Sequence, residues 1–175
     1  MLINYLLYDI IEANIRNTDF YVMKNTTLCY IEKDGAYLML HRNKKKNDEN
    51  HDKWIGIGGK FEEAETPYDC ARREIMEETN LVADYLFYRG IVTFVSDIYG
   101  TEYMHLFTTS DFHGTLSHEC DEGELVWVKK ADIKNLPIWE GDKIFLDLLD
   151  KENRFFSIKL CYTGDKLTSH EIEYR

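Results

Sequence analysis

The stretch Trp54–Leu81 reads WIGIGGKFEEAETPYDCARREIMEETNL and joins a glycine-rich segment directly to a helix signature. Its glycines permit backbone conformations that a side chain would forbid, so the first part is expected to form a loop. Thr66 is a suitable helix N-cap, Pro67 suits the first helical position, and Asp69 stands where the acid of a capping box would stand. A helix is therefore predicted to begin at residue 66 or 67.

The predicted helix carries three carboxylates on one side. At about 100° per residue, Glu74, Glu77 and Glu78 fall within an arc of about 100°. Like charges at this spacing destabilise a helix by a few tenths of a kcal/mol per pair, and a hard divalent cation would remove that penalty. The alternative is a solvated acidic face, partly balanced by Arg72 and Arg73. Because the glycine loop and the cap lie immediately upstream, the combination favours a magnesium or manganese site.

These residues resemble the Nudix box, G-x5-E-x7-R-E-U-x-E-E-x-G-U, in which U is a bulky aliphatic residue. Asn80 is the one departure, because it replaces the last glycine of the pattern. That glycine ends the helix in the left-handed conformation, where Asn is the next most tolerant residue. Segments outside the box, TLCYIEKDG, YLMLHRNKK, EGELVWV and FFSIKLCYTGDKL, resemble MutT-type Nudix enzymes of Gram-positive bacteria, the 8-oxo-dGTP diphosphatases. The positions that agree with the box are Gly59, Glu65, Arg73, Glu74, Ile75, Glu77, Glu78 and Leu81.

The resemblance implies an α+β fold, the Nudix fold, with a mixed β-sheet sandwiched between α-helices. It also implies Mg²⁺-dependent hydrolysis, with Mn²⁺ as the alternative ion, of a nucleoside triphosphate such as 8-oxo-dGTP to a monophosphate and pyrophosphate. Two alternatives stay open. One is hydrolysis of another nucleoside diphosphate derivative, such as a nucleotide sugar or a dinucleoside polyphosphate, and the other is a nucleotide-binding sensor without catalysis. Because these substrates are anionic, the acidic side chains would bind metal cations, and the cations would contact the phosphates.

The same resemblance assigns metal ligands and a group that activates water. Either Glu74 or Glu78 would orient or deprotonate the attacking water, and the sequence does not rank the two. An additional metal-binding acid of this family precedes a late strand; Glu122 matches that place best, and Glu119 and Glu124 could substitute. The implied metal ligands are the Gly58 carbonyl and the carboxylates of Glu74, Glu77, Glu78 and Glu122.

Other residues of the motif have roles outside metal binding. Arg73 would hold a glutamate in place through a charge-assisted hydrogen bond, and Glu65 would brace the glycine loop, which includes Gly59, against the helix. Lys60 is a candidate phosphate contact and equally an ordinary surface lysine at a turn. The basic and polar stretch 41–53 is expected to be a solvated loop, or else a cationic arm that meets phosphates.

Trp139 and Asp142 are the candidate contacts to the base. They match a segment in which family members that act on oxidised purines use a tryptophan and acids to stack on and hydrogen-bond the base. Here Gly141 stands at one of the acid positions, and Ile55 stands where a base-contacting asparagine would be. A plain core role for Trp139 is the alternative. Because stacking holds any base and hydrogen bonds select one, the preferred base stays open.

Composition excludes several other classes of protein. With 21 Lys and Arg against 32 Asp and Glu, the net charge of −11 opposes a large surface for DNA or RNA. No run approaches the roughly 18 apolar residues that span a bilayer, and the N-terminus lacks a signal-peptide pattern. The four cysteines form no Cys-x-x-Cys pair and are expected to be reduced. A cytoplasmic monomer or homodimer that binds a nucleotide, and neither a membrane nor a nucleic acid polymer, is expected.

The domain is predicted to span residues 23–175. Residues 1–22, with helical periodicity over 2–15, are either a helical N-terminal extension or a misassigned start. A hairpin turn is expected at Lys33-Asp34-Gly35, and a second turn at Thr163-Gly164-Asp165. The expected strands are 26–31, 36–41, 91–95, 103–108, 125–128, 154–162 and 167–174, with a short helix over 143–149.

Overall fold

The computed structural model describes residues 23–45, 48–117 and 120–175, so the predicted extension 1–22 with its helix lies outside the described residues. The strands are β1 (Lys24–Lys33), β2 (Ala36–His41), β3 (Trp54–Ile55), β4 (Leu81–Ala83), β5 (Phe87–Ser96), β6 (Gly100–Thr109), β7 (Phe112–Gly114), β8 (Glu124–Lys129), β9 (Phe156–Thr163) and β10 (Lys166–Tyr174). The helices are α2 (Pro67–Thr79), α3 (Lys130–Ile133) and α4 (Glu140–Lys151).

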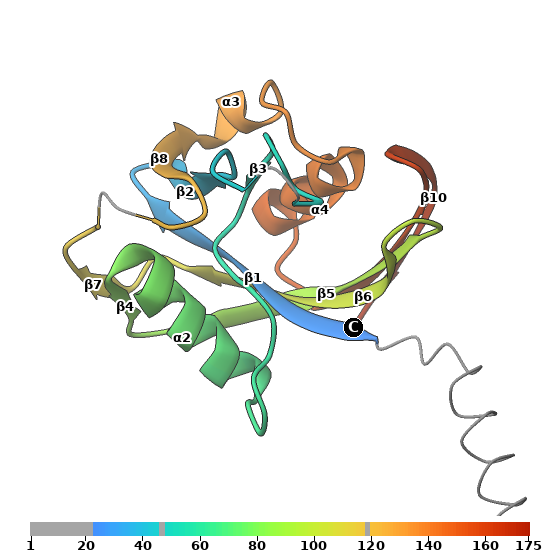
Figure 1. Ribbon diagram of the computed structural model, residues 1–175. Coiled ribbons are helices and arrows are strands. Elements are labelled where there is room, and N and C mark those ends of the chain that lie inside the picture. Colours follow the sequence, from blue (N-terminus) through green and yellow to red (C-terminus); the bar gives the residue numbers. More distant parts are fainter. Residues whose placement is uncertain (1–22, 46–47, 118–119) are drawn as a thin grey trace, which may run out of the picture.

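Most strands belong to one mixed sheet with the order β10-β9-β5-β6-β1-β2-β3, and β8 pairs with β2 along its whole length, from Ala36 to His41. The pairs β1–β6 and β5–β9 are parallel, and the remaining pairs are antiparallel. Figure 1 shows α2 and α4 on opposite sides of β1. The α+β class and the mixed sheet between helices, expected from the sequence, are therefore confirmed.

Strand β1 is buried on both faces, which explains its apolar sequence. Leu28 and Tyr30 point into the cluster that contains the apolar face of α4, whereas Cys29 and Ile31 point into the cluster beneath α2. Successive strand residues face opposite sides of a sheet, so one strand supplies both cores. Because β1 lies between α2 and α4, the segments that precede these two helices both lie beside β1.

Helix α2 begins and ends where local chemistry predicts. Thr66 is the N-cap, its side chain accepts a hydrogen bond from the Asp69 backbone, and Asp69 returns the bond as in a capping box. Ala71 and Ile75 bury one face of the helix against the sheet. At the other end Asn80 has φ 59° and ψ 23°, the left-handed conformation expected for the residue that replaces glycine.

The other predicted elements are present with shifted ends. The hairpin turn is confirmed by the positive φ angles of Asp34 and Gly35, and the second turn by that of Gly164. The prediction that the strand after α4 begins at Arg154 is wrong, because β9 begins at Phe156. Arg154 instead turns back to pair with Glu152, at 2.5 Å, just after the helix. The predicted helix 143–149 is the central part of α4.

Four short elements, β3, β4, β7 and α3, are absent from the sequence prediction. Each has four residues or fewer. Elements this short contain too few residues to show a repeating apolar pattern. Whether such a strand forms depends on the strands that it pairs with. Across the described ranges, we find no helix with the length and apolar character needed to cross a membrane.

Substitution of Asn80 tests the helix end. Its Nδ2 donates a hydrogen bond to the Thr115 carbonyl oxygen at 3.0 Å. Asn80→Gly loses that bond, which is worth about 1 kcal/mol, but it relieves a backbone strain of similar size in the left-handed conformation. The unfolding free energies of Asn80→Gly and the unmodified chain should therefore agree within about 1 kcal/mol. Asn80→Ala loses the bond and keeps the strain, and should lower the free energy of unfolding in urea by about 1 kcal/mol. Equal stability of the two variants would contradict this account.

Candidate active site

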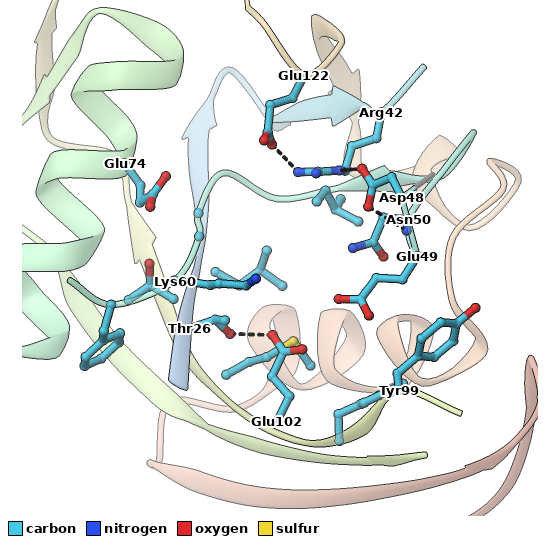
Figure 2. Close-up of a pocket in the computed structure, with 18 of the residues that line it drawn as sticks. Thr26, Arg42, Asp48, Glu49, Asn50, Lys60, Glu74, Tyr99, Glu102 and Glu122 are labelled. Atoms are coloured by element: carbon cyan, nitrogen blue, oxygen red, sulfur yellow. Dashed lines mark hydrogen bonds and ion pairs between the residues drawn. The ribbon is translucent and has the colours of Figure 1, made fainter. Parts of the chain in front are cut away.

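A cavity of about 580 Å³ opens beside β1, between the glycine loop and the start of α4. Figure 2 shows side chains that are far apart in the sequence, among them Thr26, Glu74 and Glu122, arranged around it. Its wall includes Gly58, Gly59 and Glu74 on one side and Trp139 and Asp142 on another. The segments that the sequence analysis singled out far apart in the chain therefore meet at one cavity.

The glycine loop lies directly against β1. Backbone hydrogen bonds join Thr27 N to the Gly59 oxygen at 2.9 Å and Ile57 N to the Cys29 oxygen at 2.9 Å. A Cβ atom on Gly58 would lie 2.1 Å from the Thr27 carbonyl oxygen, and one on Gly59 would lie 2.4 Å from Glu74 Oε1. A side chain at position 58 would therefore displace the loop from the backbone of β1, and one at position 59 would displace the Glu74 carboxylate. The two glycines bring the loop backbone close to the acids of α2.

Arg73 joins the loop to the helix. Its guanidinium donates to both oxygens of Glu65, at 2.7 and 2.9 Å, to Glu74 Oε1 at 2.8 Å and to Glu77 Oε2 at 3.1 Å. It also donates to the Lys60 carbonyl oxygen at 3.0 Å. The Arg73 hydrogen bonds lower the pKa of Glu65 to about 2. Arg73 thus contacts Glu65, Glu74, Glu77 and the glycine loop at once, and the roles of Glu65 and Arg73 stay predictions.

Glu78 is the most buried acid of the helix. Its residue is 8% exposed, and its Oε2 atom has no hydrogen-bond partner among the described residues. Burial raises the pKa of Glu78 to about 8, reinforced by the charges of Glu122 and Glu74, while a hydrogen bond from the Gly58 backbone and the charge of Arg42 oppose the shift. The ionised form of Glu78 therefore lacks the hydrogen bonds and positive charges that would compensate for its burial.

The other carboxylates are held by cations. Glu122, at the cavity wall, pairs with Arg42 through one oxygen and with Lys45, at 2.8 Å, through the other. The side chain of Glu77 is 58% exposed and faces Arg73, and it is not part of the cavity wall. Glu124 is an exposed residue of β8, and the alternative Glu119 lies outside the described residues.

The donor set fits a divalent cation. An orphaned carboxylate oxygen, Glu78 Oε2, lies buried near two further acids, and hard cations prefer such oxygen ligands. Within the ranges described, no three His, Cys, Asp or Glu side chains form a ready-made metal cluster. The contacts explain this, because Glu74 is turned to Arg73 and Glu122 to Arg42.

The far end of the cavity is aromatic. Trp139 is 8% exposed, belongs to the core cluster and also lines the cavity, so both of its predicted roles agree with its position. Its Nε1 donates to Asn50 Oδ1 at 2.8 Å, and Phe94 and Tyr99 approach its ring edge-on at 6.1 and 6.2 Å. Asp142 lies beside it on α4, and burial raises the pKa of Asp142 to about 8.

Sequence reasoning found part of the charged cavity wall. Lys60, the candidate phosphate contact, lines the cavity, and so do Arg42 and Lys45 of the stretch 41–53, which was offered as a cationic arm. Glu102 of β6 also lines the cavity and was missed. The positive charge of the stretch 41–53 was the available signal for Arg42 and Lys45. No local pattern marks Glu102, because its place depends on the parallel pairing of β6 with β1.

Comparisons with known proteins agree with this geometry. The model of the NUDIX domain matches residues 23–149. The Nudix hydrolase YvcI of Bacillus subtilis is 28% identical over 156 residues, which is 86% of this chain and 95% of the relative. The oxidized purine nucleoside triphosphate hydrolase of Danio rerio is 30% identical, over 87% of this chain and 96% of its own. The crystal structure of a MutT protein from Bacillus halodurans superposes with a TM-score of 0.77, at 25% identity, covering 86% and 98% of the chains.

The raised pKa of Asp142 predicts a pH-dependent stability. Because the folded pKa lies above the usual 3.8, the folded state retains a proton that the unfolded state loses, so stability falls as pH rises from about 4 to about 8. Asp142→Asn removes this effect. The stability of Asp142→Asn relative to the unmodified chain should rise by on the order of 4 kcal/mol between pH 5 and pH 8.

Thermal unfolding of both proteins at a series of pH values measures this difference. Asp165→Asn, on the exposed turn after β9, is the control for loss of a surface carboxyl group. A gap between Asp142→Asn and the unmodified chain that stays constant with pH would show that Asp142 is ionised in the folded protein.

Proposed function

The chain belongs to the NUDIX domain family and is a Nudix hydrolase, and from this premise we propose that it converts a nucleoside triphosphate to a monophosphate and pyrophosphate. An oxidised purine triphosphate such as 8-oxo-dGTP is the leading substrate. The observation that carries the proposal is the cavity itself. Glu74 and Glu122 line its wall, the buried Glu78 interacts electrostatically with both of these acids, and aromatic side chains line another part of the wall. The name of the Danio rerio relative supports the oxidised purine.

The acids would hold Mg²⁺, with Mn²⁺ as the alternative. Glu74, Glu78, Glu122 and the Gly58 carbonyl would be ligands, with Glu77 as a further candidate. When bound, the metal would supply positive charge to the phosphate chain and orient it for displacement. Glu78 also has the free oxygen needed to orient or deprotonate water, whereas Oε1 of Glu74 is held by Arg73.

The remaining cavity residues would position the nucleotide. Lys60, Arg42 and Lys45 would contact phosphates, which provides positive charge at the cavity wall of an acidic chain. Arg73 would keep Glu74 oriented. At the other end Trp139 would stack on the base and Asp142 would hydrogen-bond it. With its net charge of −11, the chain is proposed to act on free nucleotides and not on nucleic acid polymers.

The experiment is a substrate panel with the purified full chain and Mg²⁺. It contains oxidised and ordinary nucleoside triphosphates, nucleotide sugars and dinucleoside polyphosphates. The expected products are a monophosphate and pyrophosphate from an oxidised purine triphosphate, and chelation of the metal should abolish their release. Preferential cleavage of a nucleotide sugar or a dinucleoside polyphosphate would replace the proposed substrate class, and binding without any cleavage would favour a sensor.

Glu78→Gln separates catalysis from folding. Loss of the carboxylate should reduce kcat at least about 100-fold, because a metal ligand and a water-activating group are removed together. Thermal stability at pH 7 without metal should be nearly unchanged, since burial raises the pKa of Glu78 to about 8 and glutamine replaces a mostly neutral carboxyl group of the same size. Glu63→Gln, on the exposed part of the glycine-rich loop, is the matched control and should keep kcat within about twofold. Near-normal turnover of Glu78→Gln would place the metal site elsewhere.

A further inference from the structure

One acid on the cavity floor is not used by the proposed chemistry. Glu102 lies on β6, in register with Phe94 of β5 and with Lys24 of β1. Figure 2 shows its carboxyl group at the floor, on the other side of the cavity from Glu122. The other cavity-lining residues of β1, β5 and β6 are Thr26, Thr27, Leu28, Phe94 and Met104. Glu102 is thus the one acid that these three strands contribute to the described cavity wall, and the charges of Glu49, Lys24 and Lys60 act on it.

The carboxyl group is fixed on one side and open on the other. Thr26 Oγ1 donates a hydrogen bond to Glu102 Oε1 at 2.7 Å. For Oε2, no hydrogen bond or ion pair is recorded within the described part of the chain, and Lys24 pairs instead with Glu49 at 3.3 Å. Burial and the charge of Glu49 raise the pKa of Glu102, while the Thr26 hydrogen bond and the charges of Lys24 and Lys60 oppose that rise. Oε2 is therefore an acceptor at the cavity wall that an N–H or O–H group of a ligand can meet.

The aromatic side chains near Glu102 suggest that the N–H donors of the ligand belong to a nucleotide base. Phe94, its register partner, has its ring 6.1 Å from that of Trp139, and Tyr99 on the adjoining turn has its ring 6.2 Å from Trp139. These three aromatic residues line the same cavity. Figure 2 shows Tyr99 and Glu102 at one end, away from Glu74 and Glu122. A nucleotide whose phosphates lie near Gly58 and Glu74 would direct its base toward this end.

We propose that Glu102 is a specificity-determining residue that accepts hydrogen bonds from the adjacent N1–H and 2-amino groups of a guanine-type base. The inference rests on the proposed function, because it requires a nucleotide in the cavity. An ionised carboxylate only accepts hydrogen bonds, and two parallel N–H donors match its two oxygens. A purine without the 2-amino group would leave the acid with one donor fewer. Asp142, whose pKa is about 8, can present a proton to a base carbonyl.

The test compares two substrates that differ only at the 2-amino group, dGTP and dITP. The unmodified chain should prefer dGTP in kcat/KM by at least about 10-fold. Glu102→Gln keeps the size of the side chain but replaces an acceptor with an N–H donor, which opposes the base. It should lower kcat/KM for dGTP about 10- to 100-fold, mainly through KM, and change that for dITP less than about threefold.

A matched control removes a neighbouring acid. Glu49→Gln makes the same chemical change in another cavity-lining glutamate, which is already paired with Lys24, and should leave the dGTP to dITP ratio unchanged. Thr26→Val removes the hydroxyl that orients Glu102 and should reduce the ratio in the same direction. Equal losses for both substrates in Glu102→Gln, or no loss at all, would overturn the inference.

A binding assay separates this inference from the proposed function. Quenching of tryptophan fluorescence measures binding of dGMP and dIMP without hydrolysis. If no triphosphate is hydrolysed but dGMP binds more tightly than dIMP and Glu102→Gln removes the difference, the proposed function fails and the inference stands. If pyrophosphate is released but the ratio does not depend on Glu102, the inference alone fails. If the unmodified chain binds neither monophosphate, the inference is overturned.

Discussion

The close approach of the glycine loop to β1 is the constraint on which the candidate site depends. Hydrogen bonds from Thr27 to Gly59 and between Cys29 and Ile57 hold the loop backbone against the central strand. A Cβ on Gly58 would lie 2.1 Å from the Thr27 oxygen, so any side chain there would push the loop away. Because α2 follows this loop directly, its acidic face is directed to the same point as the loop carbonyls.

Two arginines counter the repulsion among the acids, and they leave one acid uncompensated. Arg73 binds Glu65 and Glu74, and Arg42 binds Glu122, so these carboxylates have partners without a metal. Glu78 has a buried oxygen without one within the described residues. A buried carboxyl group that lacks a partner costs stability. The structure therefore keeps an unfavourable group at the point where the family resemblance places the metal, as expected where function and stability conflict.

Local chemistry explains which parts of the molecule could be predicted from the sequence. The start of α2 rests on Thr66 and Asp69, and its end rests on the tolerance of Asn80 for left-handed geometry, all within one short stretch. Glu102 could not be predicted, because its environment arises from the parallel pairing of strands far apart in the chain. The ion pair of Arg42 with Glu122 has the same origin, since the two residues are 80 positions apart.

The rigidity of the aromatic end determines which residues can select a base. Trp139 is packed in the core and hydrogen-bonded to Asn50, so a base would stack on a surface that is already ordered. Such a platform adds affinity at little entropic cost, but every base has a π face, so it adds little discrimination. Selection must then come from polar groups that meet the base edge. On the described cavity wall near Trp139, Glu102 and Asp142 provide such groups.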